Sequence, residues 1–532
     1  MSFEGIKFLS GWFRLDDRSV VMEGLKIVLE IDNTGGDFLL MEYAYPGREE
    51  ERGVSVTVKV FDKTAGHFRG FYSFPFYIGF KIPPCHREKL LVTLEVDQTY
   101  TRRGPDGKTK EHGLVLFHLE LLNRQTDRSR YEIFEKKVEN LKQHFLGLLD
   151  PSRQAQPLPM ALLIEPTSRC NMDCVMCARS LPGHRKEEEC DLSDELVSLL
   201  GRGMEGIQGC RIQGLGEPLI SRNFLPLMDL LEANRVHVVT FNTNGTMLTE
   251  KIARSLVEKG KTFEHFRVSF SLDAATQETY SKIRNGNLDR TLKNIRFLQE
   301  FKKKMRASNP SVFINMTLSR TNIKDLPKFI GLASDLDAQV ELNNLALDKG
   351  YESIEVSRGQ QYAFHYIEEV LSAYPKLYNQ CLRKAEALAK KRNVVIHKAG
   401  DVAPMDIPES RMRFLSRLAE ILRRPLRSGM AAKSDLKLLR QPGDKDPTFE
   451  RLPLCLLPWT QMVISSRGDI SLCCVQGQID HLRNHDSLEE AWNSENICRI
   501  REMLKNRTFP PECQTADCTV RKWNTRVCIV HQ

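Results

Sequence analysis

Three closely spaced cysteines are the residues of this chain best suited to carry chemistry. Cys170, Cys174 and Cys177 follow an apolar, strand-like run and have the spacing C-x3-C-x2-C. Three thiolates on one short loop can hold three irons of a cubane iron–sulfur cluster and leave the fourth iron without a protein ligand. An open coordination position is a place for chemistry, whereas a structural zinc site normally takes four protein ligands. Spacing alone leaves zinc binding or unrelated core cysteines as alternatives.

Further polar segments follow predicted strands later in the chain. Gly216 allows the backbone to approach a ligand closely, and the neighbouring Glu217 could accept hydrogen bonds from an ammonium group. Later segments offer a hydroxyl and a carboxylate that could hold a ribose, and a guanidinium that could pair with a carboxylate. Each segment alone is equally typical of a local turn or cap. The segments are 214–219, 242–245, 269–273 and 319–322.

Alternating strand and helix patterns from 160 to 348 must position these residues. Repeated βα units predict a parallel sheet, and about six of them can curl into a partial barrel. Active sites of such sheets lie at the carboxyl ends of the strands. The three cysteines directly follow the first strand, where this rule places a site. The predicted strands are 161–164, 210–214, 236–242, 266–272, 312–318 and 340–345.

The composition indicates a globular protein of several domains. A chain of 532 residues with 41% hydrophobic and 27% charged residues is ordinary for a soluble protein of about three or four domains. No signal peptide is visible and no apolar window is long enough to span a membrane, so we expect a cytoplasmic protein. Fourteen cysteines are too sparse for a disulfide scaffold, and their clustering favours metal ligation in a reducing compartment. The net charge of +8 is modest.

The predicted fold class is an α/β partial (β/α)6 barrel flanked by two other domains. The N-terminal region alternates short apolar and polar runs, which is typical of an antiparallel β-sandwich. The last region is rich in cysteine and short strands, as in an α+β domain. The expected boundaries are 1–128 for the sandwich, 129–159 for a helix and linker, 160–348 for the barrel, 349–450 for a helical and basic connection, and 451–532 for the last domain.

The motifs of the barrel region together resemble the radical S-adenosylmethionine (SAM) superfamily. The resemblance implies a [4Fe–4S] cluster on Cys170, Cys174 and Cys177, whose open iron chelates SAM. It also implies reductive cleavage of SAM to a 5′-deoxyadenosyl radical that abstracts a substrate hydrogen. Met176 stands where the family usually has an aromatic residue near the adenine. The implied cofactor-binding residues are Met176, Gly216, Glu217, Asn244, Ser271, Asp273 and Arg320.

The C-terminal cysteines resemble the SPASM/Twitch extension of radical SAM enzymes, which carries auxiliary iron–sulfur clusters. Only Cys528 follows Cys518, so we expect one auxiliary [4Fe–4S] cluster rather than two. Cys474 could replace Cys473, and four thiolates would also suit zinc. Such a cluster could accept the second electron of a substrate oxidation or position the substrate. The expected ligands are Cys455, Cys473, Cys513 and Cys518.

The remaining regions offer two indications of the substrate. The N-terminal sandwich resembles modules attached to enzymes of bacterial surface-polysaccharide assembly. Residues 410–427 form a basic amphipathic pattern that could lie on an anionic membrane, although a solvated helix face explains it equally well. Nucleic acid is not expected, because no aromatic residues are interleaved with this basic patch.

Three functional hypotheses follow. The first is a radical SAM oxidoreductase that oxidises or epimerises a sugar, glycan or lipid-linked precursor. The second is a peptide-modifying radical SAM enzyme of the maturase type, which the SPASM-like region alone would favour. The third is a non-catalytic iron–sulfur or carbohydrate-binding protein. Either enzyme would need a reductant such as flavodoxin or ferredoxin.

Overall fold

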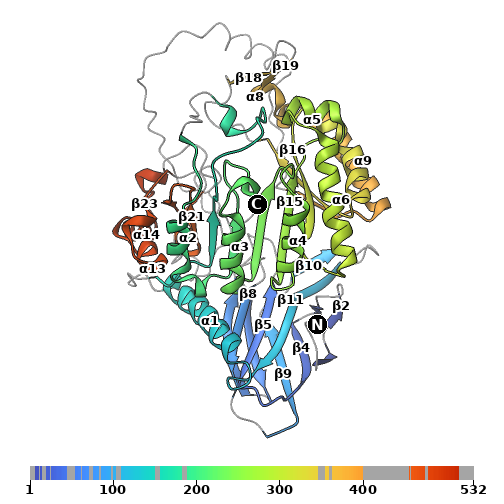
Figure 1. The fold of residues 1–532 in the computed structure, drawn as a ribbon. Coiled ribbons are helices and arrows are strands. Elements are labelled where there is room, and N and C mark those ends of the chain that lie inside the picture. The colour runs from blue at the N-terminus through green and yellow to red at the C-terminus, as the bar shows by residue number, and fades with distance from the viewer. Residues whose placement is uncertain are drawn as a thin grey trace.

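The computed structural model (Figure 1) shows an N-terminal pair of sheets, a large central sheet and a C-terminal region that extends this sheet. The residues that it describes are 6–10, 12–14, 20–23, 25–44, 54–61, 63–70, 76–82, 86–96, 100–103, 109–149, 156–181, 188–345, 354–358, 362–398, 455, 457–473 and 477–513.

Two antiparallel sheets form the N-terminal region. Burial alternates along strand β4 (Lys26–Asp32), as expected for a sheet with one face on a core. Leu29 and Val92 from one sheet share an apolar cluster with Met41 and Leu119 from the other, so the sheets pack face to face. One sheet has the order β1 (Ile6–Ser10), β4 (Lys26–Asp32), β9 (Lys89–Val96), β6 (Val54–Val60), β7 (Lys63–Gly70). The other has the order β2 (Trp12–Arg14), β3 (Val20–Glu23), β11 (Thr109–Leu122), β5 (Phe38–Ala44), β8 (Phe76–Lys81), with β10 (Tyr100–Arg103) paired to β11.

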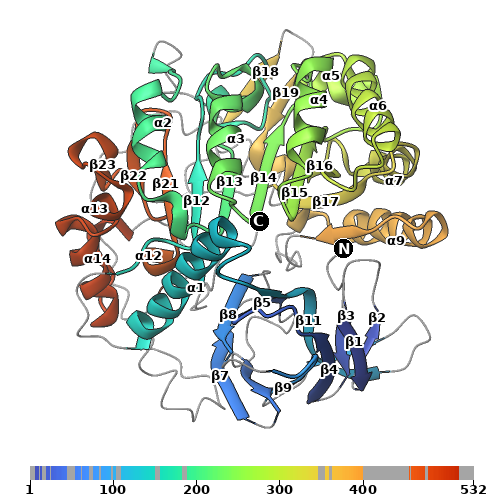
Figure 2. The same ribbon diagram turned by 60° about the horizontal axis from the view of Figure 1, so that its bottom comes forward.

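Helix α1 (Arg128–Leu149) lies between this region and the central sheet (Figure 2). It packs on β8 and on the 3-10 turn η3 (Met204–Gly206). Its Lys137 is completely buried and donates a hydrogen bond to the carbonyl oxygen of Ile207. Burial disfavours the charged ammonium and lowers the pKa of Lys137 to about 7. Asn140 donates to the carbonyl oxygens of Leu158, at 3.0 Å, and Gly206, at 3.3 Å.

The central sheet contains six parallel strands that are neighbours in chain order. This arrangement confirms the expected parallel sheet, and the strand predicted at 161–164 corresponds to β12. Helices α2 to α7 lie along the outer side of these strands (Figure 2), and their side chains close the large apolar core. The strands are β12 (Ala161–Ile164), β13 (Gly209–Ile212), β14 (Val238–Thr243), β15 (His265–Ser271), β16 (Ser311–Leu318) and β17 (Gln339–Asn344). The helices are α2 (Asp194–Gly201), α3 (Phe224–Ala233), α4 (Glu250–Lys259), α5 (Gln277–Arg284), α6 (Leu288–Lys304) and α7 (Leu326–Asp335).

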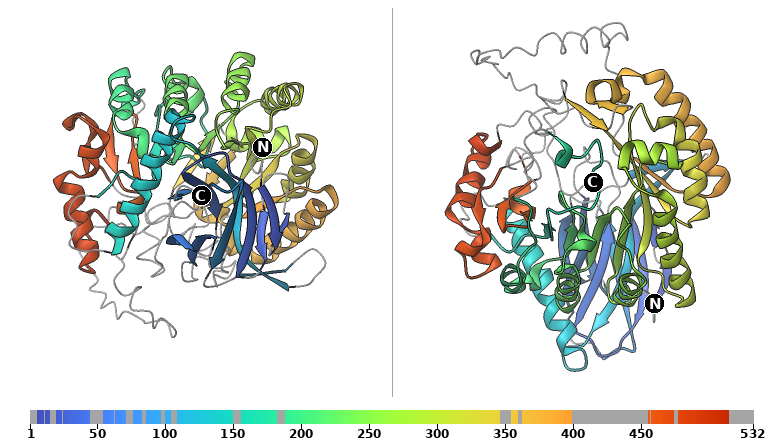
Figure 3. Two further views of the ribbon diagram at one scale, coloured as in Figure 1. Left: turned by 90° about the horizontal axis from the view of Figure 1, so that it is seen from below. Right: turned by 45° about the horizontal axis from the view of Figure 1, so that its top comes forward.

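The chain after β17 contributes to both edges of this sheet. Strand β20 (Ile396–Lys398) pairs with β17, and α9 (Pro375–Arg392) packs on α7. Strand β21 (Gln461–Ile464) pairs with β12 in parallel, and β22 (Asp469–Ser471) and β23 (Asp480–His481) continue antiparallel, so the described part of this sheet has ten strands. The red C-terminal elements lie at one side of the molecule in both views of Figure 3. The basic pattern at 410–427 lies outside the described residues. The remaining elements are β18 (Glu355–Arg358), β19 (Tyr362–His365), α8 (Tyr366–Glu369), α12 (Leu457–Thr460), α13 (Leu488–Trp492) and α14 (Glu495–Lys505).

Candidate active site

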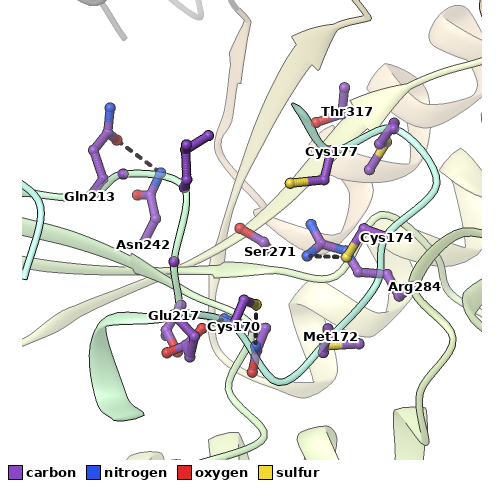
Figure 4. A pocket seen from close by; sticks show the side chains of 16 residues that line it. Cys170, Met172, Cys174, Cys177, Gln213, Glu217, Asn242, Ser271, Arg284 and Thr317 are labelled. Atoms are coloured by element: carbon purple, nitrogen blue, oxygen red, sulfur yellow. Dashed lines mark hydrogen bonds between the residues drawn. The ribbon is translucent and has the colours of Figure 1, made fainter. Parts of the chain in front are cut away.

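A pocket of about 360 Å³ opens at the carboxyl ends of the central strands (Figure 4). Its walls come from the loops after β12, β13 and β14, from the ends of β15 and β16, and from the last residue of α5. The sequence-predicted residues that it brings together are Cys170, Cys174, Met176, Cys177, Gly216, Glu217, Asn244 and Ser271.

The cysteine loop folds tightly after β12. The amide of Cys177 donates to the carbonyl oxygen of Cys174 at 3.1 Å, and the side chain of Asn244 reaches the sulfur of Cys170 at 3.9 Å. Burial raises the pKa of the Cys170 thiol and raises that of Cys174 to about 11. Ligation by a metal centre would offset the free-energy cost of forming these buried thiolates, because a bound cation favours the thiolate.

The three thiols do not form a site for a single metal ion. Among the described residues, no three Cys, His, Asp or Glu side chains converge as ligands of a single metal ion. A cubane does not require such convergence, since each thiolate binds a different iron.

A buried ion pair holds the cysteine loop from outside the pocket. Arg179 pairs with Glu189 and donates a hydrogen bond to the carbonyl oxygen of Met172 at 3.2 Å. The hydroxyl of Ser180 donates to the carbonyl oxygen of Cys174 at 2.8 Å. These bonds hold the backbone between the first two cysteines in place.

The glycine loop lies directly against the residues that precede the cysteines. A Cβ at Gly216 would lie 2.1 Å from the carbonyl oxygen of Thr167 and 2.5 Å from that of Arg169, so only glycine fits there. The next amide, of Glu217, donates to the carbonyl oxygen of Arg169 at 2.8 Å. The glycine loop and the start of the cysteine loop are therefore in direct backbone contact.

Glu217 places a buried carboxylate at this contact. Its oxygens accept hydrogen bonds from the Thr243 hydroxyl and the Asn244 amide, both at 2.6 Å, and from the Leu219 amide at 3.2 Å. Only 2% of Glu217 is exposed, and burial raises its pKa. A buried carboxylate that borders a pocket is suited to receive a cationic group.

Asp273 does not line the pocket itself, but it pairs with Arg284, which does. Asp273 is completely buried, accepts a hydrogen bond from the Thr317 amide at 2.6 Å and pairs with Arg284. The Arg284 guanidinium lines the pocket and donates to the sulfur of Cys174 at 3.5 Å. Sequence reasoning missed Arg284. The available signal was a basic residue in the last turn of the helix that follows Asp273.

The expectation for Arg320 needs correction. Its guanidinium lies against the Tyr374 ring, donates to the Tyr374 hydroxyl at 3.2 Å and is 3.9 Å from Glu368. It does not line the pocket. The strand–helix pattern could not reveal that β16 ends beside the α8–α9 segment, whose polar groups attract this side chain.

Three strand-end residues outside the implied set of cofactor-binding residues also line the pocket. These are Gln213, Asn242 and Thr317. The side-chain amide of Asn242 donates a hydrogen bond to the side-chain oxygen of Gln213 at 3.2 Å. Positions two residues earlier on neighbouring strands carry Ser269 and Asn315, each within 3.3 Å of a carboxylate oxygen of Glu341. The inner face of the sheet is therefore polar below the pocket. Period-two alternation could have indicated these residues.

The second cysteine set is described in part. Cys455 precedes α12, Cys473 follows β22, and Cys513 ends the 3-10 turn η8 (Pro511–Cys513). Cys474 and Cys518 lie outside the described residues, so the proposed ligand set stays a prediction.

Comparisons with known proteins agree with the motifs. The radical SAM superfamily model matches residues 164–333, and the iron–sulfur cluster-binding SPASM domain model matches residues 455–519. The probable GTP 3′,8-cyclase of Methanocaldococcus jannaschii is 28% identical over 185 residues, which cover 34% of this chain and 57% of that protein. The mycofactocin maturase MftC of Mycobacterium tuberculosis is 30% identical over 205 residues, which cover 37% of this chain and 48% of that protein. The chain thus spans about half the length of these curated relatives.

Among solved structures, Streptococcus suis SuiB matches with a TM-score of 0.44 and 13% identity, covering 76% of this chain and 88% of that one. This likeness is too low to carry an argument about function.

Proposed function

We propose that this chain, which carries a radical SAM domain followed by a SPASM iron–sulfur domain, reductively cleaves SAM and abstracts a hydrogen atom from a peptide substrate. The observation that carries the proposal is the pocket in which three cysteines, a glycine loop and a buried carboxylate meet. Members of the radical SAM superfamily are enzymes, which argues against the non-catalytic hypothesis.

The residues present fit the two groups that the radical SAM domain implies. Three thiols lie on one loop, and Gly216, which has no side chain, lines the same pocket. Cys170, Cys174 and Cys177 would hold the [4Fe–4S] cluster. When bound, the cluster and SAM supply a 5′-deoxyadenosyl radical, so the protein's task is binding, orientation and exclusion of water.

Glu217, Asn244 and Ser271 would orient SAM from three strand ends. Glu217 would receive the ammonium group, because it is a carboxylate in a water-poor position. Arg284 would offer its guanidinium to an anionic group of the ligand, since Asp273 fixes its direction from behind. The thioether of Met176 would pack on the adenine.

The substrate proposal follows the relatives. These relatives include the mycofactocin maturase and a Pyrococcus furiosus protein that modifies the cofactor of a tungsten-containing aldehyde ferredoxin oxidoreductase. The second is 27% identical over 191 residues, which cover 35% of this chain and 52% of that protein. They favour the peptide-modifying alternative over a sugar, glycan or lipid-linked substrate, which no finding supports.

The SPASM domain implies auxiliary iron–sulfur chemistry rather than structural zinc. We propose one auxiliary cluster, held by Cys455, Cys473, Cys513 and Cys518, that accepts an electron from the substrate radical or positions the peptide. A flavodoxin or ferredoxin would reduce the first cluster. No described helix combines the length and apolar character that a bilayer crossing needs.

Anaerobic incubation of the reconstituted chain with SAM and dithionite tests the radical step. We expect 5′-deoxyadenosine, detected by chromatography and mass spectrometry. A fully loaded cluster that yields none would refute the proposal. A candidate peptide encoded by a neighbouring gene, synthesised with deuterium at its aliphatic positions, tests the substrate class. Transfer of deuterium into 5′-deoxyadenosine would support a peptide, and transfer from a sugar nucleotide alone would refute it.

A further inference from the structure

The carboxylate of Glu165 lies between the glycine loop and a turn of the C-terminal region. One carboxylate oxygen accepts a hydrogen bond from the Leu215 amide at 2.6 Å. The other accepts two from Ser466, one from its amide at 3.1 Å and one from its hydroxyl at 2.9 Å. One side chain at the end of β12 therefore joins two segments that are 251 residues apart in sequence, at 215 and 466.

Gly214 shows how closely the glycine loop follows this carboxylate. A Cβ at Gly214 would lie 2.2 Å from the carboxylate oxygen of Glu165 and 2.4 Å from its Cγ. The backbone of the glycine loop thus contacts the Glu165 side chain at Gly214. At Gly216 it contacts the backbone that leads into the cysteine loop. Its conformation depends on both supports.

The turn that presents Ser466 is itself well ordered by hydrogen bonds. The amide of Gly468 donates to the carbonyl oxygen of Ser465 at 2.9 Å, and the Ser465 hydroxyl donates to Asp469 at 2.9 Å. The pairing of β12 with β21 ends at Ile164 and Ile464, immediately before Glu165 and the turn. The parallel register therefore sets the distance between Glu165 and Ser466.

The same turn also contacts the segment that supports the cysteine loop. Arg467 donates to the carbonyl oxygen of Glu188 at 2.6 Å. Two residues later, the amide of Cys190 donates to the Ser168 hydroxyl at 2.9 Å, and the Ser168 amide donates to the carbonyl oxygen of Cys190 at 3.0 Å. The turn is thus connected to both loops of the pocket.

We infer that Glu165 is a positioning residue through which the SPASM domain sets the conformation of the glycine loop, so that SAM affinity depends on the turn at Ser466. The inference rests on the proposed function, because the glycine loop must be a SAM contact. The coupling is reciprocal: a turn that orders the loop for SAM is itself ordered when SAM binds.

The glycine loop has a second attachment, independent of Glu165. Loss of the Glu165 carboxylate can therefore alter the position of the loop without unfolding it. The Glu217 amide keeps its bond to Arg169 without Glu165, so loss of the carboxylate changes the direction of the Leu215 amide rather than unfolding the loop. A glutamine at 165 can offer one oxygen acceptor but not two, and its amide group would face a donor.

SAM binding to the full-length, anaerobically reconstituted chain tests this inference. The Kd for SAM is measured by calorimetry, and the EPR signal of the reduced first cluster is recorded across a SAM titration. We expect Glu165→Gln to raise the Kd about tenfold and Ser466→Ala about threefold, as for lost buried hydrogen bonds. The EPR change should shift to correspondingly higher SAM concentrations, with iron content unchanged.

Arg483→Ala is the matched control. It removes another contact between the two domains, the 3.0 Å bond to Glu195, which does not reach the glycine loop. Its SAM affinity should stay within about twofold of the parent chain. Should Glu165→Gln fail to fold, Ser466→Ala with this control decides the question.

The inference is wrong if both variants bind SAM like the parent chain, or if Arg483→Ala weakens binding equally. A parent chain that holds its cluster but binds no SAM would instead overturn the proposed function, and the inference with it.

Discussion

The radical SAM and SPASM regions of this molecule differ in how their proposed cluster ligands are brought together. In the radical SAM domain, three cysteines lie within eight residues of one loop, and described residues from neighbouring strand ends line a pocket with them. In the SPASM domain, Cys455, Cys473 and Cys513 lie before α12, after β22 and after α14. The first ligand set is local, and the second depends on the tertiary structure.

The supports of the two regions differ accordingly. Strand β12 and the Arg179–Glu189 pair hold the first loop. The second region depends on a buried Arg501, which donates to the carbonyl oxygen of Pro458 at 2.8 Å and lies 4.3 Å from the Trp492 ring. The cysteines of the first site are brought together by one short sequence motif, whereas those of the second depend on how the C-terminal helices pack.

The largest effect that separates the regions is expected from Cys170→Ala. Loss of one thiolate should prevent assembly of the first cluster and abolish 5′-deoxyadenosine formation, while the auxiliary cluster and its share of the iron remain. Iron analysis and anaerobic product assays measure this. Cys381→Ala, on α9 and outside the pocket, should retain both clusters. Residual 5′-deoxyadenosine at parent rates would contradict the ligand assignment.

The converse change, Cys473→Ala, should spare SAM cleavage. We expect loss of the auxiliary iron and of the modified peptide. 5′-Deoxyadenosine should still form, because the pocket around Cys170 contains none of the C-terminal cysteines. Cys474→Ala is the paired variant. If Cys474 is the true ligand, the two phenotypes exchange. Loss of SAM cleavage in both would mean that the two sites are not separable.

A smaller effect is expected from Glu217→Gln in the first region. Removal of the charge should weaken SAM binding about 10- to 100-fold, the usual range for a hydrogen bond to a charged group. Burial raises the pKa of Glu217, so the carboxylate is protonated at a higher pH than an ordinary carboxyl. The SAM Kd of the parent chain should therefore rise as pH falls through that raised pKa.

Calorimetric titrations at several pH values check both parts. The glutamine variant should lose this component of the pH dependence, and an identical profile in both proteins would contradict the role of Glu217.

The last expected effect concerns stability rather than cluster chemistry, and it should reach both regions together. Burial lowers the pKa of Lys137 from the ordinary lysine value of 10.5 to about 7 in the folded chain, so the unfolded chain binds more protons between these pH values. The free energy of unfolding should therefore rise with pH from about 7 toward 10.5, and be independent of this group below about 7.

Lys137→Met tests this linkage. It should stabilise the chain by about 1–4 kcal/mol at pH 7, as when buried charges are replaced by apolar side chains, and by less at higher pH. Thermal unfolding followed at both cluster chromophores should shift equally. A shift confined to one cluster would show that the domains unfold separately, and a variant less stable at every pH would contradict the cost of the buried amine.

Much of the first site could be predicted from sequence because its parts are short motifs at strand ends. Gly216 and Glu217 lie where the strand–loop rule places them, and the pocket collects them with the cysteines. Arg284 was missed because only the folded α5 turns it back toward Asp273. Arg320 was misjudged because its partners, Tyr374 and Glu368, come from a later segment.

The joining of β21 to β12 could not be predicted either. The pairing sets Leu162 against Met462, and the residues between them carry no local signal of it. Such long-range pairing follows from the complete fold, because the hydrogen bonds of a sheet edge accept any compatible strand.

The late arrival of β21 has a consequence for synthesis of the chain. One neighbour of β12, strand β13, is synthesised soon after it, but the other neighbour, β21, follows only about 300 residues later, since β12 begins at Ala161 and β21 at Gln461. During that interval β12 is an unprotected sheet edge with apolar side chains, the kind of surface that pairs with other chains and aggregates. Translation that stops before Gln461 should therefore give insoluble protein, and chaperone demand should fall once the C-terminal strands emerge.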